Sequence, residues 1–94
     1  MTEGLKLDSH HRHTLGKVFE HPLTHNLQWH DLLSLLEAVA EVSEGKDGRY
    51  KVRLGVETET FDVPRGKDVT EQQIIDIRRM LRNAGITPEG LEAH

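Results

Sequence analysis

Residues 49–54 alternate strictly between basic and apolar side chains, a pattern typical of a strand with one buried face and one face in water. The basic residues are Arg49, Lys51 and Arg53, and the apolar ones are Tyr50, Val52 and Leu54. Gly55-Val56 predicts a two-residue turn, because glycine accepts the positive φ that such a turn needs. The return strand, 57–63, then places Phe61 opposite Tyr50 and turns Phe61 and Val63 to the buried face. This stretch therefore predicts a β-hairpin.

Segments with helical spacing flank the hairpin. A first apolar stripe lies within 26–40 and consists of Trp29, Leu32, Leu33, Leu36, Val39 and Ala40. A last helix is expected to begin at Thr70 and to end at the C-terminal cap Gly85, with a stripe of Ile74, Ile77, Met80, Leu81 and Ala84. Residues 41–43 would add a third strand. These patterns predict an α+β domain with a three-stranded antiparallel sheet packed on helices.

The N-terminal part of the chain shows weaker patterns. Residues 14–20 predict a short helix capped by Thr14, with Leu15, Val18 and Phe19 on its apolar side, which completes the order α(α)βββα. Residues 1–13 and 87–94 have little to bury, so we expect a mobile arm and a mobile tail around a domain at 14–86. The chain has 94 residues and no cysteine, which fits one small domain without disulfides.

Charge and hydropathy narrow the function classes. No apolar run approaches the roughly 18 residues that span a bilayer, and residues 1–4 lack the pattern of a signal peptide. We therefore expect a cytoplasmic protein with no membrane partner. The formal net charge is −4, which disfavours bulk affinity for nucleic acid, so any phosphate-binding surface must be local.

From Asn26 to Ile86 the chain resembles the HicA-type toxin family. The matching pieces are the Leu-rich first helix, the glycine of Gly48-Arg49-Tyr50, the apolar-Pro pair Val63-Pro64 and the helix that closes as 79–86. Residues 14–22 look like the extension found in one branch of that family. The resemblance implies a fold like that of double-stranded-RNA-binding domains. For active members it implies cleavage of mRNA, neutralised by a HicB-type antitoxin.

The chain departs from this family at its catalytic positions. The resemblance places the family's first histidine at Tyr50, and the second, just after the proline, is absent because Arg65 and Gly66 follow Pro64. A tyrosine with a reference pKa of about 10 does not supply the base near neutral pH that RNA cleavage needs. We therefore expect a non-catalytic relative and assign no catalytic residue. A weaker alternative keeps ribonuclease activity, with His30 or His25 as the base.

Histidines concentrate in the N-terminal third of the chain. His21 and His25 have the spacing of two ligands on one helical face, and His10, His11 or His13 could join them from the arm. Pro22 interrupts the helix that would align the pair, and the chain has no cysteine ligand. We therefore expect neither a metal site nor a cofactor.

Basic residues supply the candidate nucleic-acid-binding site. Arg78, Arg79 and Arg82 share a face of the last helix, and Arg65 and Lys67 lie in the loop before it. Such a patch could contact duplex phosphates by shape. The alternative is an ordinary solvated face, in which Asp76 pairs with Arg79. The same alternative applies to the basic residues of the strand, because Arg49 lies opposite Asp62.

Two function classes follow. In the first, the chain is a non-catalytic HicA-like domain that binds RNA or a HicB-like antitoxin. In the second, it is a protein-interaction module without nucleic-acid binding, self-associating into a homo-oligomer through a sheet edge or through the short N-terminal helix.

Overall fold

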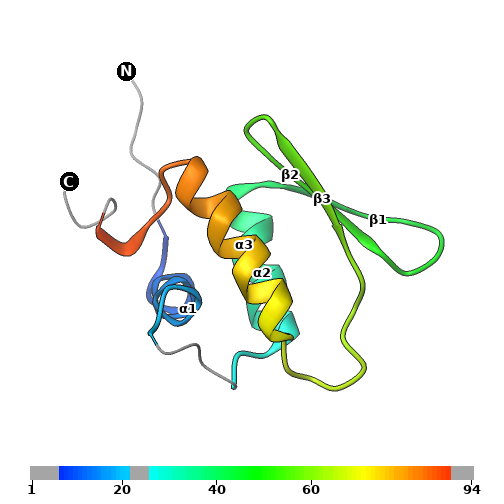
Figure 1. Ribbon diagram of the computed structural model, residues 1–94, viewed down its shortest axis with the longest axis horizontal. Helices are drawn as coiled ribbons and strands as arrows, with labels where there is room; N and C mark the ends of the chain where they lie inside the picture. The colour runs from blue at the N-terminus through cyan, green and yellow to red at the C-terminus, as the bar shows by residue number, and fades with distance from the viewer. Residues whose placement is uncertain (1–6, 22–25, 90–94) are drawn as a thin grey trace.

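The computed structural model describes residues 7–21 and 26–89 (Figure 1). Its elements follow the order α1 (Ser9–Val18), α2 (Trp29–Val39), β1 (Glu41–Glu44), β2 (Tyr50–Leu54), β3 (Glu57–Phe61) and α3 (Glu71–Asn83). The predicted α+β fold, with its three-stranded antiparallel sheet, is confirmed. None of the described helices combines the length and the apolarity needed to traverse a bilayer.

The hairpin has the predicted register. Tyr50 lies opposite Phe61 and Lys51 opposite Thr60, while Gly55 adopts a φ of 63° at the turn. Arg49 Nε lies 2.9 Å from Asp62 Oδ1, as expected from their opposite positions. β1 pairs with the other side of β2, so β2 is central and both β1 and β3 are edge strands. Val63 was expected on the buried face but is 46% exposed, because β3 ends at Phe61.

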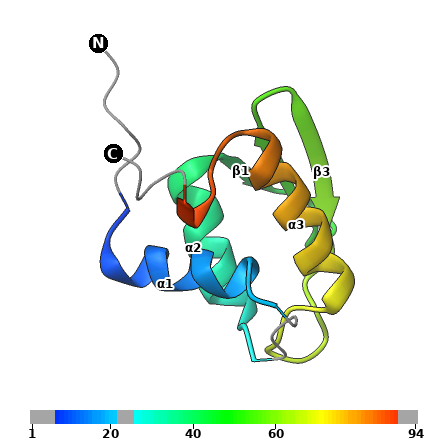
Figure 2. The same ribbon diagram turned by 60° about the vertical axis from the view of Figure 1, so that its left-hand side comes forward.

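The molecule has three layers. α2 and α3 lie side by side against one face of the sheet, and α1 packs on the side of this helix pair that faces away from the sheet (Figures 1 and 2). The apolar residues of all three helices and of the inner sheet face form one core, whose least exposed members include Val18, Leu32, Leu35, Val52 and Leu81. The outer face of the sheet has no covering layer among the described residues.

The start of the first helix was predicted wrongly. α1 begins at Ser9 rather than at Thr14, because the Asp8 carboxylate accepts a hydrogen bond of 2.9 Å from the His11 backbone N–H and caps the helix. Thr14 is buried and its hydroxyl donates to the His10 carbonyl. Leu7 is only 8% exposed, so residues 7–13 belong to the folded domain rather than to an arm. Residues 1–6 and 90–94 lie outside the described residues.

The other helix ends follow from local hydrogen bonds. α2 begins at Trp29 instead of Asn26, because Gln28 forms a bridge with Asp68 and the Trp29 N–H donates to the Lys67 carbonyl over 2.7 Å. α3 begins with a capping box in which Thr70 and Gln73 satisfy each other's backbone N–H groups. It ends at Asn83, and the predicted cap glycine, Gly85, follows with a φ of 78° and donates its N–H to the Arg82 carbonyl.

Candidate nucleic-acid interface

Arg78 joins α3 to the end of α1. Its Nε donates to the Val18 carbonyl over 2.9 Å, and its Nη2 donates to the Glu20 carbonyl over 3.1 Å. The guanidinium carbon lies 5.9 Å from the centre of the Phe19 ring, and that of Arg82 lies 5.8 Å from it. Carbonyl oxygens and an aromatic ring carry no full negative charge. These contacts therefore hold α1 in place without compensating the positive charge of either arginine.

Arg79 points to the sheet instead. Its Nη2 lies 2.8 Å from Glu59 Oε2 and 3.7 Å from Glu57 Oε1. The proposed pairing of Arg79 with Asp76 is not formed, since Asp76 accepts from Gln72 and both acidic partners of Arg79 come from β3. Glu57 and Glu59 lie on the same face of the sheet as Phe61, because alternate residues of β3 face the same side. This alternation is the sequence signal that could have predicted both glutamates on the face that α3 covers. Arg79 is therefore neutralised and does not contribute a free charge.

Arg65 and Lys67 lie in the loop between β3 and α3. Neither makes an ion pair within the described part of the chain, and both side chains are exposed. Arg65 lines a hollow of about 500 Å³ between this loop and the first turns of α3. The five predicted residues thus do not form one patch. Arg65 and Lys67 lie before α3, Arg78 and Arg82 face α1, and Arg79 faces the sheet.

Tyr50 occupies the position that the resemblance gives to a catalytic histidine. The tyrosine is half-buried, and its ring centre lies 5.8 Å from that of Trp29. Removal from water raises the pKa of Tyr50 above its ordinary value of 10.0, and the nearby carboxylates of Glu44 and Glu37 add to the increase. The phenol therefore stays protonated at neutral pH and is unsuited to act as a base.

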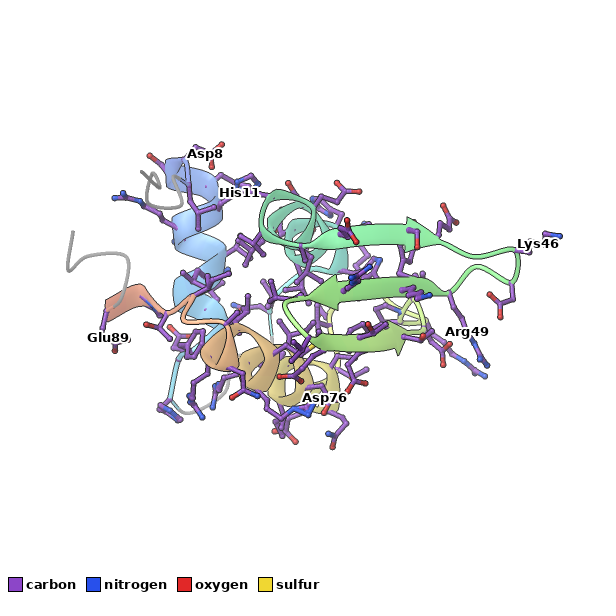
Figure 3. All side chains as sticks on the ribbon, turned by 90° about the horizontal axis from the view of Figure 1, so that it is seen from above. Asp8, His11, Lys46, Arg49, Asp76 and Glu89 are labelled. Atoms are coloured by element: carbon purple, nitrogen blue, oxygen red, sulfur yellow. The ribbon has the colours of Figure 1, made fainter. Side chains whose placement is uncertain are left out.

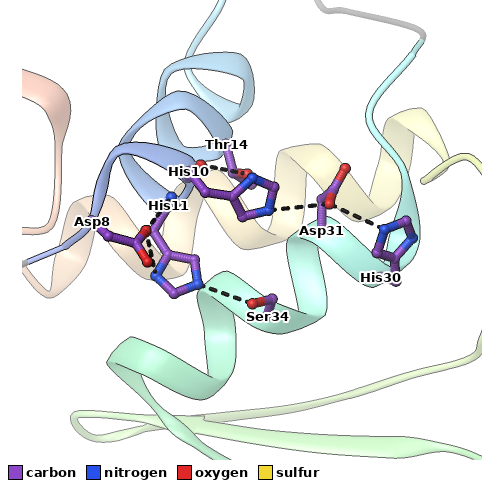
Figure 4. A network of polar contacts seen from close by, with 7 residues as sticks. All are labelled: Asp8, His10, His11, Thr14, His30, Asp31 and Ser34. Carbon is purple, nitrogen blue, oxygen red and sulfur yellow. Dashed lines mark hydrogen bonds and ion pairs between the residues drawn. The ribbon is translucent and has the colours of Figure 1, made fainter.

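Five histidine and carboxylate groups of the N-terminal third form contacts between α1 and α2 (Figure 4). Asp31 Oδ1 lies 3.2 Å from both His10 Nε2 and His30 Nε2. His11 contacts Asp8 through Nδ1 over 3.3 Å and Ser34 Oγ through Nε2 over 2.9 Å. The backbone N–H of His11, followed by the charges of the neighbouring imidazoles, lowers the pKa of Asp8 below its ordinary value of 3.8.

The order Ser34, His11, Asp8 matches the connectivity of a catalytic triad. Ser34 lies in the middle of α2, however, where the neighbouring backbone N–H groups are committed to the helix and cannot stabilise an oxyanion. The hollows beside β1 and β2, between β3 and α3, and at the β2–β3 turn are lined by other residues. The network instead fixes α1 on α2, an arrangement that sequence spacing alone did not reveal.

The histidines are also candidate metal ligands and candidate bases. Within residues 7–21 and 26–89, no group of three or more His, Asp or Glu side chains has the arrangement of a metal site. His25 lies outside the described residues, so the proposed pair with His21 has no structural counterpart here. The His30 side chain is 76% exposed and contacts Asp31.

The outer face of the sheet carries the second set of basic residues. Arg49 pairs with Asp62 and, more distantly, with Asp47, and Arg53 Nη1 lies 3.6 Å from Glu41 Oε1. Lys51 lies between Ser43 and Thr60 at the centre of this face and makes no ion pair with a described residue. Most of the charge on this face is therefore compensated.

Comparison of the chain with family models, with curated proteins and with solved structures finds no match.

Proposed function

We propose that this chain is a non-catalytic HicA-like domain that binds RNA in the cytoplasm through contacts to phosphate groups. The observation that carries the proposal is a set of basic side chains, before α3 and at the α1–α3 contact, that have no carboxylate partner among the described residues. They are Arg65, Lys67, Arg78 and Arg82. Cations without carboxylate partners can replace the counterions of a phosphate backbone, whereas Arg79 would first have to leave Glu59.

Tyr50 is the reason to expect no cleavage of RNA. A base must accept a proton near neutral pH, and the raised pKa of this phenol opposes that role. Arg65 and Gly66 follow Pro64, where the resemblance expects the second histidine, and neither supplies an acid or base suited to neutral pH. The proposal therefore assigns binding to the basic residues and no chemistry to the site.

The binding test uses charge reversal in the loop before α3. We expect the double variant Arg65→Glu, Lys67→Glu to weaken binding to duplex RNA of any sequence. The slope of log affinity against log salt should also become less steep, by the amount that about two phosphate contacts contribute, because fewer counterions are released on binding. Fluorescence anisotropy between about 50 and 200 mM salt measures both effects. Lys46→Glu, at the tip of the β1–β2 loop (Figure 3), is the matched control and should change neither. Equal losses in both variants would exclude a local interface.

A protein partner is the second candidate, and the open sheet edges favour it. Among the described residues, β1 and β3 each pair on one side only, which leaves an outer edge to which another chain could add. The resemblance makes a HicB-like antitoxin the natural partner to test. Co-expression followed by size-exclusion chromatography should then yield a stable complex, and separate elution would remove this candidate.

A further inference from the structure

The outer edge of β1 presents backbone groups that no described residue pairs with. Gly45, just after β1, donates its N–H to the Arg49 carbonyl over 2.7 Å, so its backbone groups point toward the β2 side. Alternate residues of an antiparallel strand turn their N–H and C=O groups to the same neighbour. The backbone groups of Val42 and Glu44 therefore point outward, away from β2. Figure 3 shows β1 along the edge of the sheet on the side away from α3.

On the outer face of the sheet, Lys51 makes no ion pair with a described residue. It lines a hollow of about 310 Å³ together with Ser43 and Glu41, beside the free edge of β1. Glu41 lies near Arg53, but the closest distance, from Arg53 Nη1 to Glu41 Oε1, is 3.6 Å, and the two side chains are 66% and 80% exposed. An exposed contact of this kind is weak, so Glu41 remains open to a second cation. The hollow therefore suits a carboxylate that enters from beyond β1.

A second copy of this chain satisfies the free edge at one register. When two β1 strands pair antiparallel with Val42 opposite Val42, the N–H and C=O groups of the two valines bond reciprocally. The N–H of Glu44 then meets the carbonyl of Ala40 of the other copy. Ala40 has an extended backbone, and its own N–H donates to the Leu36 carbonyl inside its chain. The two-fold axis doubles the contact between Glu44 and Ala40, so the pairing makes about four main-chain hydrogen bonds.

The same register brings the unpaired cation to a carboxylate. Glu41 lies opposite Ser43 of the second copy and two strands, about 9.6 Å, from its Lys51, with both side chains on the outer face. Glutamate and lysine are long enough to meet over the small serine, so the glutamate enters the hollow that Ser43 and Lys51 line. On the inner face, half-buried Val42 packs against Val42 of the other copy.

Other arrangements of the two copies lack these contacts. A shift of one residue turns the helical layers to opposite faces of the joint sheet. A shift of two residues, with Ser43 opposite Ser43, places Glu44 against Val42 and leaves Lys51 without a carboxylate. Pairing of β1 with β3 of another copy leaves a free edge at each end and continues into a filament, whereas pairing of β1 with β1 closes.

We propose that two copies of this chain pair through β1, antiparallel about a two-fold axis at Val42, and so join their sheets into one. Lys51 of each copy forms an ion pair with Glu41 of the other. The pairing uses none of the four cations proposed to contact RNA, so the two proposals stand or fall separately.

The first experiment divides the ion pair between two variants. Sedimentation equilibrium of the nuclease-treated full chain, up to about 1 mM, should show a dimer and no larger species. Glu41→Lys and Lys51→Glu should each weaken this dimer at least about tenfold, because like charges replace both ion pairs. An equimolar mixture of the two variants should regain the affinity of the parent chain, since a mixed dimer again pairs opposite charges twice.

Arg12→Glu makes the same charge change as Lys51→Glu on an exposed part of α1 and is the matched control, which should dimerise like the parent chain. A parent chain that stays monomeric at about 1 mM, or a mixture that associates no better than its components, would overturn the proposal.

Hydrogen exchange tests the strand pairing on the unaltered chain. The amides of Val42 and Glu44 should exchange more slowly as the protein concentration rises, because their outward N–H groups become bonded in the dimer. By alternation from the Gly55-Val56 turn, Thr58 and Thr60 carry the outward amides of β3 and serve as the internal control. Exchange that is independent of concentration at Val42, or slowed at Thr58 and Thr60 instead, would contradict pairing through β1.

Discussion

At the scale of single residues, the arginines of α3 show how neighbours decide what a charge does. Arg78 and Arg79 are adjacent in the sequence, yet one bonds to carbonyls of the α1 end and the other to glutamates of β3. A helical wheel predicts which face each residue occupies, but it does not reveal what packs against that face. Reversing Arg78 would therefore disturb the docking of α1 as well as any RNA contact.

We predict that Arg78→Ala lowers the free energy of unfolding by about 1 to 3 kcal/mol, because two carbonyl oxygens lose a charged donor. Urea denaturation measures this change. Arg79→Ala removes an exposed ion pair and should cost no more than about 1 kcal/mol. Similar losses in the two variants would argue against Arg78 as the tie between α1 and α3.

The Asp8 cap gives a prediction with a defined pH range. Because the pKa of Asp8 is lower in the folded state than its ordinary value of 3.8, its ionised form stabilises the fold above that pH. This contribution is lost as the pH falls through the folded value. The difference in melting temperature between the parent chain and Asp8→Ala should thus shrink steadily below about pH 4. A difference that stays constant down to pH 2 would contradict a role for the charge.

At the scale of the elements, the hairpin was predictable and the start of α1 was not. Alternation in 49–54 together with the Gly55 turn determines the register of β2 and β3, and each pair agrees with it. The helix that begins at Ser9 has a weak apolar pattern, and its cap Asp8 precedes a run of histidines with low helix propensity. His10 and His11 contact α2 and so stabilise the first turn of α1. Such tertiary contacts produce no pattern in the local sequence.

The stripe of α2 offers a test of its register. Leu36 is 1% exposed, so we expect Leu36→Ala to destabilise the fold by roughly 2 to 5 kcal/mol as a buried large-to-small change. Leu33 was predicted in the same stripe but is only half-buried, and Leu33→Ala should cost clearly less. Thermal or chemical unfolding compares them. A greater loss for Leu33 would mean that the helix is rotated relative to this description.

At the scale of the whole molecule, ion pairing divides the basic residues into two groups. Cations without a carboxylate partner among the described residues lie before α3 and at the α1–α3 contact, whereas Arg49, Arg53 and Arg79 pair with carboxylates of the sheet and of the residues that flank it. The net charge of −4 conceals this division, which is why composition alone disfavoured nucleic acid. The fold was predictable from the sequence, because burial of one face of each element produces a periodic pattern of apolar residues. The interface was not predictable, because it depends on which cations form ion pairs with carboxylates in the folded chain.

The central claim is that the domain binds RNA through these cations and leaves it intact. The most direct measurement is the slope of log Kd against log salt for a labelled RNA duplex, with the RNA recovered from each sample and sized on a denaturing gel. Four phosphate contacts, at about 0.9 per contact, predict that log Kd for a duplex rises with log salt with a slope near +3.6. The recovered RNA should keep its full length. An affinity independent of salt, no binding at about 50 mM salt, or shortened RNA would contradict the account.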